Sequence, residues 1–325
     1  MIYSAPQLLE KIQKYIAGLE YSRPPVGLYA PVEYTLALGG KRVRPLLMLM
    51  AYNIYKEEVE AVLPTAAGIE TYHNYTLLHD DLMDKADLRR GNLTVHKKWD
   101  ENTAILSGDT MLVLAYKMMT GCEECHLKAV MDIFNETALE IGEGQQYDME
   151  FETRMDVSEA EYLEMIRLKT SVLLAASLKI GAVQAGASVE DASNLYDFGL
   201  QLGLAFQLQD DYLDVYGDPA VFGKKIGGDI LCNKKTYMLI NALQRANDVQ
   251  RAELTRWIEA ENYNPQEKIQ AVTALYDAIG IKELCHEKID TYFQAAARCL
   301  DNVKVDAARK EILHNFAASL MGRKA

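Results

Sequence analysis

Apolar residues recur at helical spacing along almost the whole chain. The first series, Leu8, Leu9, Ile12, Ile16 and Leu19, is typical of a helix with one buried face. Glycine (20) and proline (8) are few for 325 residues, whereas an all-β sandwich or barrel needs many turn residues. No two strand-like runs are joined by a hairpin signal, and no segment repeats at a fixed period. The sequence therefore predicts an all-α protein.

Breaks in the apolar pattern place the expected helices. Beyond the first helix, they are expected from about Pro31 to the glycines 39–40, from Pro45 to Tyr55, from Thr65 to Asp84, and over 101–120, 124–150, 158–185, 190–215 and most of 233–322, with breaks near 262–265 and at Gly280. The polar segments 85–99 and 217–232 are expected to be loops. Because no low-complexity linker divides the chain, we expect one domain over residues 1–325, a large helical bundle around a deep central cavity.

The charge balance excludes one class of partner. Lysine plus arginine is 34 and aspartate plus glutamate is 47, so the net charge is 34 − 47 = −13. A nucleic-acid-binding protein needs a basic surface, so nucleic acid is not expected as a partner. The first residues lack the pattern of a signal peptide, and no run of about 18 apolar residues could span a membrane. A cytoplasmic protein without a membrane span is expected.

The five cysteines include one local pattern, Cys122-Glu123-Glu124-Cys125-His126. It matches the short motif that attaches c-type haem. Haem attachment of this kind requires export, for which no signal is visible. We therefore interpret the segment as an ordinary connection between helices.

Three aspartates lie close together at the end of the expected helix 65–84. Residues i and i+4 share a helix face, so Asp80 and Asp84 lie one turn apart with Asp81 beside them. Like charges repel, by about 1 kcal/mol per pair at 4 Å even in water. Aspartate at a helix C-terminus also opposes the helix dipole. A divalent cation with oxygen ligands would offset both costs.

The same D-D-x-x-D spacing returns 130 residues later, in Asp210, Asp211 and Asp214. This second motif also ends an apolar run, Leu200 to Leu208. A solvated acidic helix end explains one motif adequately but two identical ones poorly. The repetition therefore favours a pair of metal-binding motifs.

Basic residues accompany each aspartate motif. The groups are Lys41, Arg42 and Arg44; Arg89 and Arg90; Lys169, inside an apolar helix; and Lys224, Lys225, Lys234 and Lys235. Any single one could serve only solubility. Together with carboxylate-bound Mg²⁺, arginine forks and lysine point charges are suited to bind a diphosphate.

With these motifs the chain resembles the trans-isoprenyl diphosphate synthases, which make farnesyl, geranylgeranyl and longer prenyl diphosphates head to tail. The resemblance covers about Leu38 to Thr236 and includes these motifs: Gly39-Gly40-Lys41-Arg42-Val43-Arg44-Pro45, His73, Leu78-His79-Asp80-Asp81-Leu82-Met83-Asp84, Arg89-Arg90-Gly91, Gly144-Gln145-Gln146-Tyr147-Asp148, Lys169-Thr170, Phe206-Gln207-Leu208-Gln209-Asp210-Asp211-Tyr212-Leu213-Asp214 and Lys225-Ile226-Gly227-Gly228-Asp229. It departs at Leu93, where the family often has proline, and the pair Lys224-Lys225 leaves the contacting lysine ambiguous; the spacing to Asp229 favours Lys225.

The resemblance implies the isoprenoid synthase fold and a role for each matching residue. The six aspartates of the two motifs would hold three Mg²⁺ around an allylic diphosphate. That substrate would also contact Arg89, Lys169, Thr170, Gln207, Lys225 and Lys234. Isopentenyl diphosphate would contact Lys41, Arg44, His73 and Arg90, while Gln145 and Asp148 would line the site. A homodimer is implied as well, and the basic C-terminal residues Arg323 and Lys324 are a cap or a free tail.

The resemblance also implies the reaction. The allylic diphosphate ionises, the double bond of isopentenyl diphosphate attacks the cation, and the departing diphosphate takes the proton. Tyr75 and Tyr72 lie upstream of Asp80 on one helix face, where large rings would block the growing chain. Small Thr76 argues against the tightest pocket. Geranylgeranyl diphosphate (C20) is the expected product, with farnesyl diphosphate (C15) next.

Other readings of the same motifs remain open. A terpene cyclase shares the scaffold, but its second motif usually carries asparagine, serine or threonine, and glutamate. Squalene- and phytoene-type synthases differ at that motif too. The chain could also be the catalytic subunit of a synthase of longer products, or a non-catalytic subunit, although such subunits tend to lose the aspartates and all six are present here.

Overall fold

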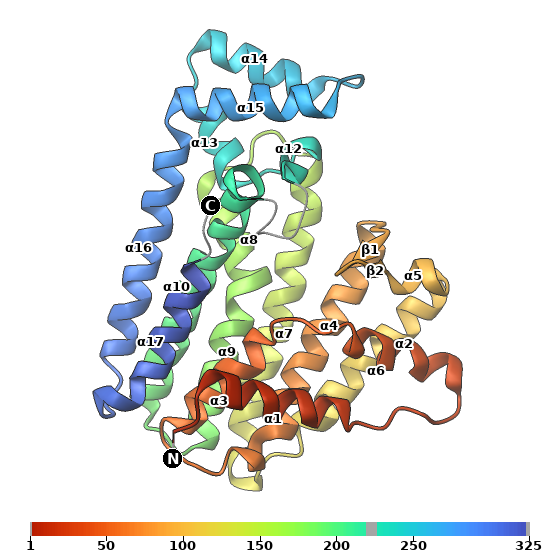
Figure 1. Cartoon of the computed structure of the whole chain (residues 1–325), viewed down its shortest axis with the longest axis vertical. Helices are drawn as coiled ribbons and strands as arrows, with labels where there is room; N and C mark the ends of the chain where they lie inside the picture. The colour runs from red at the N-terminus through yellow and green to blue at the C-terminus, as the bar shows by residue number, and fades with distance from the viewer. Residues whose placement is uncertain (1, 219–225, 323–325) are drawn as a thin grey trace. The chain divides into compact units, whose positions relative to one another are not determined.

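The computed structural model describes residues 2–218 and 226–322 (Figure 1). By its internal contacts the chain divides into two compact units. The first comprises Met1–Asn135, Ala176–Leu195 and Lys304–Leu313, and the second comprises Glu136–Ala175, Tyr196–Val303 and His314–Ala325. The helices α7, α9, α10 and α17 contribute residues to both units.

The first unit is helical apart from one small hairpin. Its elements are α1 (Ala5–Ala17), α2 (Val26–Ala37), α3 (Val43–Asn53), η1 (Val59–Val62), α4 (Leu63–Met83), β1 (Leu88–Arg89), β2 (Asn92–Leu93), α5 (Val95–Lys98), α6 (Glu101–Met119), and parts of α7 (Glu124–Thr153), α9 (Val172–Gln184) and α10 (Val189–Tyr216).

The second unit takes the remaining parts of those three helices. The α17 helix (Ala307–Met321) is also divided, because its residues up to Leu313 belong to the first unit and the rest to the second. The other elements of the second unit are α8 (Glu159–Ile166), η2 (Arg167–Ser171), α12 (Gly228–Leu231), α13 (Tyr237–Arg245), α14 (Asp248–Glu259), α15 (Pro265–Ile279) and α16 (Ile281–Asp301). The prediction of an all-α fold is confirmed.

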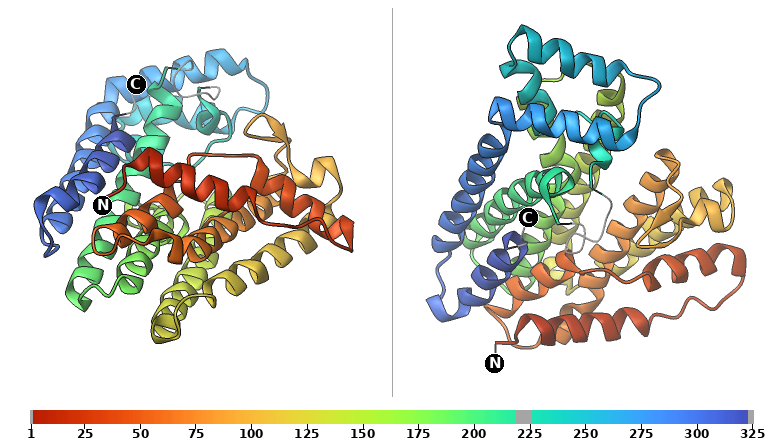
Figure 2. Two further views of the ribbon diagram at one scale, coloured as in Figure 1. Left: turned by 60° about the horizontal axis from the view of Figure 1, so that its bottom comes forward. Right: turned by 45° about the horizontal axis from the view of Figure 1, so that its top comes forward.

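Two apolar helices form the centre of the first unit. Every residue of α3 from Pro45 to Asn53 is buried, and α4 is buried on all sides over its first half. The α4 and α6 helices pack side by side, as both views of Figure 2 show. A side chain at Gly68 would crowd Met118, and one at Gly108 would collide with the ring of His79. These two glycines let the antiparallel pair approach closely along its whole length.

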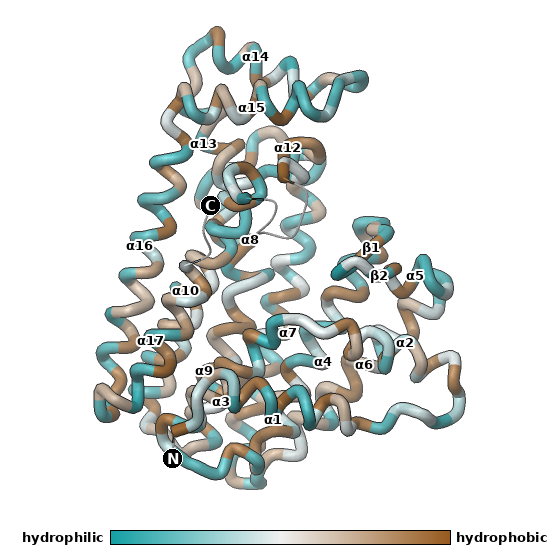
Figure 3. Tube along the Cα trace, in the orientation of Figure 1, coloured by the Kyte–Doolittle hydropathy of each residue, from teal (hydrophilic) through white to brown (hydrophobic). Residues whose placement is uncertain are grey.

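The core of the second unit lies among α8, α10, α13, α15 and α16. Large buried side chains include Tyr162, Leu208, Tyr237 and Tyr276. The peripheral helices α14 and α15 mix hydrophilic and hydrophobic residues along their length (Figure 3), as expected for helices with one exposed face. In the part of the chain that the structure describes, no helix is both long and apolar enough to cross a membrane.

The structure differs from the expected helices in several places. The second helix starts at Val26, and Pro31 lies inside it, where its carbonyl accepts a 2.8 Å hydrogen bond from Thr35 Oγ1. The expected loop 85–99 contains the hairpin β1–β2 and the short helix α5, and α12 lies within the expected loop 217–232. Further breaks separate α13 from α14 and α16 from α17. Short elements of this kind carry too few residues to show a period.

The expected helix 158–185 is interrupted by a π-helical turn, η2. Such turns are rare and occur frequently at functional sites. This one contains Lys169 and Thr170, the two residues of the segment assigned to substrate binding.

Candidate active site

The first aspartate motif lies in a tightly capped helix end. Asp80 and Asp81 belong to the last turn of α4, and the exposed Asp84 is its C-cap. Lys85 takes a left-handed conformation (φ 53°), and the backbone N–H of Ala86 donates to the Asp81 carbonyl at 2.9 Å. This Schellman-type ending satisfies the terminal carbonyls and fixes the direction of the aspartate side chains.

Arg89 is the cationic partner of this motif. Its Nε donates to Asp81 Oδ2 at 2.6 Å, and its Nη2 lies 3.5 Å from Asp80 Oδ2. Asp81 is only 5% exposed, and this burial raises the pKa of its carboxyl despite the neighbouring guanidinium. A buried carboxylate of this kind is stabilised by any added positive charge.

The hairpin separates two consecutive arginines. Leu88 pairs with Leu93 and Arg89 with Asn92, so Arg90 and Gly91 form the turn, both with positive φ (53° and 76°). Arg89 reaches back to the aspartate motif, whereas Arg90 donates to the Gly39 carbonyl. A Cβ at Gly40 would lie 2.8 Å from the Arg90 guanidinium carbon, so glycine leaves room for it there. Sequence spacing alone had not predicted this hairpin.

The basic residues after Gly40 have different surroundings. Lys41 is exposed. Arg42 is buried, adopts φ 49°, and donates to Glu70 Oε1 and to the Leu36 carbonyl, both at 2.6 Å. It therefore supports the fold of this segment rather than facing a substrate. Buried Glu70, which also accepts from Asn74 Nδ2 at 3.0 Å, had no signal in the sequence beyond being one more acidic residue.

Arg44 points to His73. Their Nη1 and Nε2 atoms lie 3.0 Å apart. Burial, and then the charges of Arg44 and Arg90, hold the pKa of His73 well below its usual value. The imidazole is thus neutral, and because Nε2 accepts from Arg44, its proton is on Nδ1. Arg44, His73 and Arg90 form a cationic group with one neutral hydrogen-bond donor.

The residues assigned to chain length lie in an aromatic cluster. The Tyr72 ring is buried, 5.1 Å from the Phe134 ring and 5.5 Å from the Tyr75 ring, and Tyr116 packs on Phe134 at 5.0 Å. Thr76 is half-buried and donates to the His73 carbonyl at 2.8 Å. Tyr116 and Phe134 were missed in the sequence, because they are distant in the chain and join Tyr72 only in the fold.

The second aspartate motif occupies the last two turns of α10. Asp211 is 3% exposed and accepts hydrogen bonds from Tyr162 Oη and, at 3.0 Å, from Gln207 Nε2. Burial, reinforced by the charge of Asp229, raises the pKa of Asp211 to about 7. Asp214 accepts from the Asp229 N–H at 2.9 Å. Tyr162, which the sequence did not single out, thus holds a predicted metal ligand.

The π turn connects to this motif. Thr170 Oγ1 donates to Gln207 Oε1 at 3.2 Å. Lys169 Nζ donates to Asp148 Oδ2 at 2.6 Å, and the charges of Lys234 and Lys169 outweigh burial and lower the pKa of Asp148. The structure therefore joins the predicted residues in two pairs, Lys169 with Asp148 and Thr170 with Gln207, which start from adjacent residues of the π turn. Gln145, on the same helix as Asp148, is half-buried.

The comparisons with known proteins decide the family. Residues 25–276 match the family model described as polyprenyl synthetase. The chain belongs to the polyprenyl synthetase family.

Individual relatives of this polyprenyl synthetase agree. It is 44% identical to a geranylgeranyl diphosphate synthase of Methanosarcina mazei over 68% of its own chain and 69% of that protein. It is 38% identical to a geranylfarnesyl diphosphate synthase of Aeropyrum pernix over 86% and 89% of the two chains. A crystal structure of a geranylgeranyl pyrophosphate synthase matches with a TM-score of 0.93 and 42% identity, over 99% of this chain and all (100%) of that one. The chain is a short-chain trans-prenyltransferase, and no comparison supports a terpene cyclase.

The donor set of this polyprenyl synthetase fits magnesium. Both motifs offer only carboxylate oxygens, the ligands that Mg²⁺ prefers. Asp81 and Asp211 are buried where burial disfavours the charged form, so a bound cation would stabilise both. Among the described residues neither motif brings three ligand oxygens within 4.8 Å of one another.

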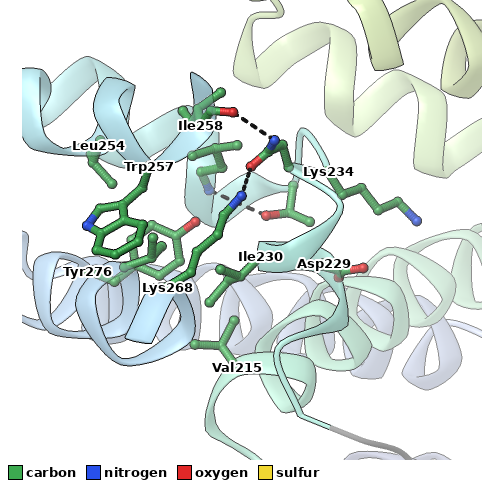
Figure 4. A pocket seen from close by; sticks show the side chains of 13 residues that line it. Val215, Asp229, Ile230, Lys234, Leu254, Trp257, Ile258, Lys268 and Tyr276 are labelled. Carbon is green, nitrogen blue, oxygen red and sulfur yellow. Dashed lines mark hydrogen bonds between the residues drawn. The ribbon is translucent and has the colours of Figure 1, made fainter. Parts of the chain in front are cut away.

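A buried lysine holds the turn that carries Lys234 (Figure 4). Lys268 is 1% exposed and donates from Nζ to Asn233 Oδ1 at 2.7 Å, while Asn233 Nδ2 donates to the Ile258 carbonyl at 3.0 Å. Asn233 itself has a positive φ of 52°. The adjoining cavity of about 10 Å³ holds at most one water, so it is no substrate pocket. Lys234 extends away from it.

Four basic residues singled out in the sequence lie outside the described residues. They are Lys225, assigned to the allylic substrate, its neighbour Lys224, and Arg323 and Lys324 near the C-terminus. Their roles stay predictions.

Close packing around the π turn gives a direct test of its importance. A Cβ at Gly144 would collide with the backbone N of Lys169, and one at Gly203 would lie 2.6 Å from Ser171 Cα. We expect Gly144→Ala to cost about 1–3 kcal/mol of stability through overpacking. Because it displaces Lys169, we also expect kcat to fall about 10- to 100-fold.

Gly142→Ala is the matched control, since nothing lies within 4 Å of a Cβ at that position on the same helix. It should retain activity and gain stability from better helix propensity. Thermal unfolding and steady-state kinetics of both variants measure these effects. Equal behaviour of the two variants would show that the π turn does not need this close contact.

Proposed function

We propose that this polyprenyl synthetase joins isopentenyl diphosphate to allylic diphosphates and releases geranylgeranyl diphosphate as its main product. The observation that carries the proposal is that the β1–β2 hairpin directs two consecutive arginines to different partners. Arg89 contacts the first aspartate motif, while Arg90 joins Arg44 and His73 near the Gly39-Gly40 turn. A reaction between two diphosphates requires two anion sites next to each other, and the hairpin supplies a cation to each.

The allylic substrate would be bound by the aspartates together with basic and polar side chains. When bound, Mg²⁺ neutralises the diphosphate as it leaves, which lowers the barrier to ionisation. Three ions held by all six aspartates are proposed. Arg89, Lys169 and Lys234 add positive charge, and Thr170 and Gln207 add hydrogen bonds; Lys225 is proposed for the same role.

Isopentenyl diphosphate would be bound by Lys41, Arg44, His73 and Arg90. Arginine forks fit phosphate oxygens in a bidentate manner, and the neutral His73 can donate from Nδ1. Asp148 Oδ2 accepts a hydrogen bond from Lys169 Nζ at 2.6 Å and so holds the lysine in position, while Gln145 would line the same site.

The aromatic cluster supports a short product. The Tyr75 ring packs against the Tyr72 ring, and the Tyr72 ring packs against Phe134. The two tyrosine rings thus form a packed barrier on the face of α4 upstream of the aspartates. An isoprenoid chain growing along that face would stop there, because displacing a packed aromatic ring leaves a costly cavity. Half-buried Thr76 leaves more space than a large residue would, which favours C20 over C15.

Four further expectations stay predictions. They are the homodimer, the cytoplasmic location, the single domain with a central cavity, and the absence of a nucleic-acid partner. A role as the catalytic subunit of a synthase of longer products is the remaining alternative, and product analysis decides it.

One incubation tests the proposal. The purified chain is mixed with radiolabelled isopentenyl diphosphate and, in separate tubes, dimethylallyl, geranyl or farnesyl diphosphate with Mg²⁺. We expect turnover without a partner protein and a C20 product from every primer. EDTA should abolish the turnover, and excess Mg²⁺ should restore it. A main product beyond C25 would refute the proposed barrier, and no turnover without a second protein would refute the proposal that the chain acts alone.

A further inference from the structure

The turn between α6 and α7 carries a cluster of side chains that prenyl transfer does not use. It consists of Glu123, Cys125 and His126, with Cys122 just before them. One ligand atom from each of Glu123, Cys125 and His126 lies within 4.8 Å of the others. Within residues 2–218 and 226–322, this is the one such group of three histidine, cysteine or acidic side chains.

The distances in this cluster approach those of a metal centre. Cys125 Sγ lies 3.8 Å from Glu123 Oε2, and His126 Nε2 lies 4.0 Å from the same oxygen. A tetrahedral Zn²⁺ with bonds of about 2.0–2.3 Å separates its ligand atoms by about 3.3–3.8 Å. The third pair, Cys125 Sγ and His126 Nε2, lies within 4.8 Å, so rotamer adjustments of at most about 1 Å would bring the three atoms onto one ion.

The chemistry of the cluster is selective. Thiolate and imidazole ligands favour Zn²⁺ and related transition ions, whereas Mg²⁺ takes oxygen ligands. Cys125 and His126 also lie in the first turn of the 30-residue helix α7, so the helix backbone holds them next to each other. Cys122 precedes it at the C-x-x-C spacing that often places two thiolates on one zinc ion. Glu123 and Cys125 are exposed, so an ion can enter directly from solvent.

We propose that Glu123, Cys125 and His126, with Cys122 as fourth ligand, form a Zn²⁺ site that ties the α6–α7 turn together. The site is separate in chemistry from the magnesium-binding aspartates. Binding exchanges the thiol protons for the metal, and no oxidant or reductant takes part.

Cobalt substitution tests the proposal directly. The full-length protein is reduced, stripped of metal with EDTA and titrated with Co²⁺ in excess Mg²⁺, which occupies oxygen-only sites. We expect one equivalent of Co²⁺ to give the sulfur-to-metal charge-transfer absorption and the intense visible bands of a tetrahedral thiolate site. One equivalent of Zn²⁺ should bleach both.

The variants identify the ligands. We expect Cys125→Ser and His126→Ala each to weaken binding at least about 100-fold, since even an outer-shell partner of a zinc ligand is worth 10- to 100-fold. Cys232→Ser is the control, because Cys232 is also exposed but lies outside the cluster, and it should bind like the parent. Helical circular dichroism and Mg²⁺-dependent turnover of each variant show that folding is intact.

Three results would overturn the inference. Co²⁺ spectra without thiolate bands would do so, as would unchanged binding in Cys125→Ser. A Cys122–Cys125 disulfide that forms equally fast with and without Zn²⁺ would also overturn it, since bound zinc protects its thiolates from oxidation.

Discussion

Asp211→Asn lowers kcat/KM about 10³-fold without lowering stability. The amide keeps the shape: its oxygen can still accept from Gln207 Nε2, and its NH2 group can donate to Tyr162 Oη, but it loses the charge that would hold Mg²⁺. Loss of one preorganised group that stabilises developing charge typically costs 10²–10³ in rate. Steady-state kinetics with saturating Mg²⁺ measure the loss.

Stability separates a metal ligand from a structural aspartate. Burial raises the pKa of Asp211 to about 7 in the folded chain, above its unfolded value. The free energy of unfolding therefore falls progressively as the pH rises from about 4 through 7, because the carboxyl group ionises more easily in the unfolded chain. In EDTA, we expect Asp211→Asn to match the parent at low pH and to exceed it increasingly towards pH 8.

Asp197→Asn is the control for this experiment. Asp197 lies exposed on the same helix, α10, so its loss should leave both activity and stability within the usual range of surface changes. If Asp211→Asn kept activity within tenfold of the parent, or lost several kcal/mol in EDTA, the residue would be a structural aspartate and the proposed metal site would need other ligands.

Tyr75→Ala extends the product by at least one isoprene unit. The Tyr75 ring is half-buried and lies 5.5 Å from the Tyr72 ring and 4.9 Å from the His79 ring. Removing it therefore takes away the part of the barrier that lies nearer to the aspartates. Chromatography of the products formed from farnesyl diphosphate should show C25 or longer chains in place of C20.

Tyr72→Ala should extend the product further, but it should also destabilise the fold more than Tyr75→Ala does. Tyr72 is 2% exposed and packs on Phe134, so its loss should destabilise the fold by about 3–5 kcal/mol. Tyr147→Ala is the control, because that ring is 41% exposed. An unchanged product from Tyr75→Ala in a folded enzyme would refute the role of this ring.

Several structural features were predictable because they depend on short spacings. Helix periodicity located α4 and α10, and the D-D-x-x-D pattern placed three aspartates at the end of each. The contacts of these side chains were less predictable. Asp81 meets Arg89 through a hairpin whose two-residue strands show no pattern, and Asp211 meets Tyr162, which lies 49 residues away in the chain.

Residues of one type also received different roles in the fold. Arg42 and Arg44 look equivalent in the sequence, yet Arg42 is buried with Glu70 and Arg44 contacts His73. Lys268 looked like one lysine among many on an amphipathic helix, but it is buried and holds the turn before Lys234. Neighbours across the fold decide whether a charge is buried and paired or left at the surface, and no local pattern records them.

The sequence by itself determined the all-α class, the two aspartate motifs and the basic residues that follow them, since helix period and motif spacing are local properties. Only the tertiary structure decided which arginine faces which motif, that Lys169 lies in a π turn closed by Gly144 and Gly203, and which rings support Tyr72. Each of these depends on close contact between segments far apart in the chain. Such contacts follow from how the whole core packs, which single positions do not specify.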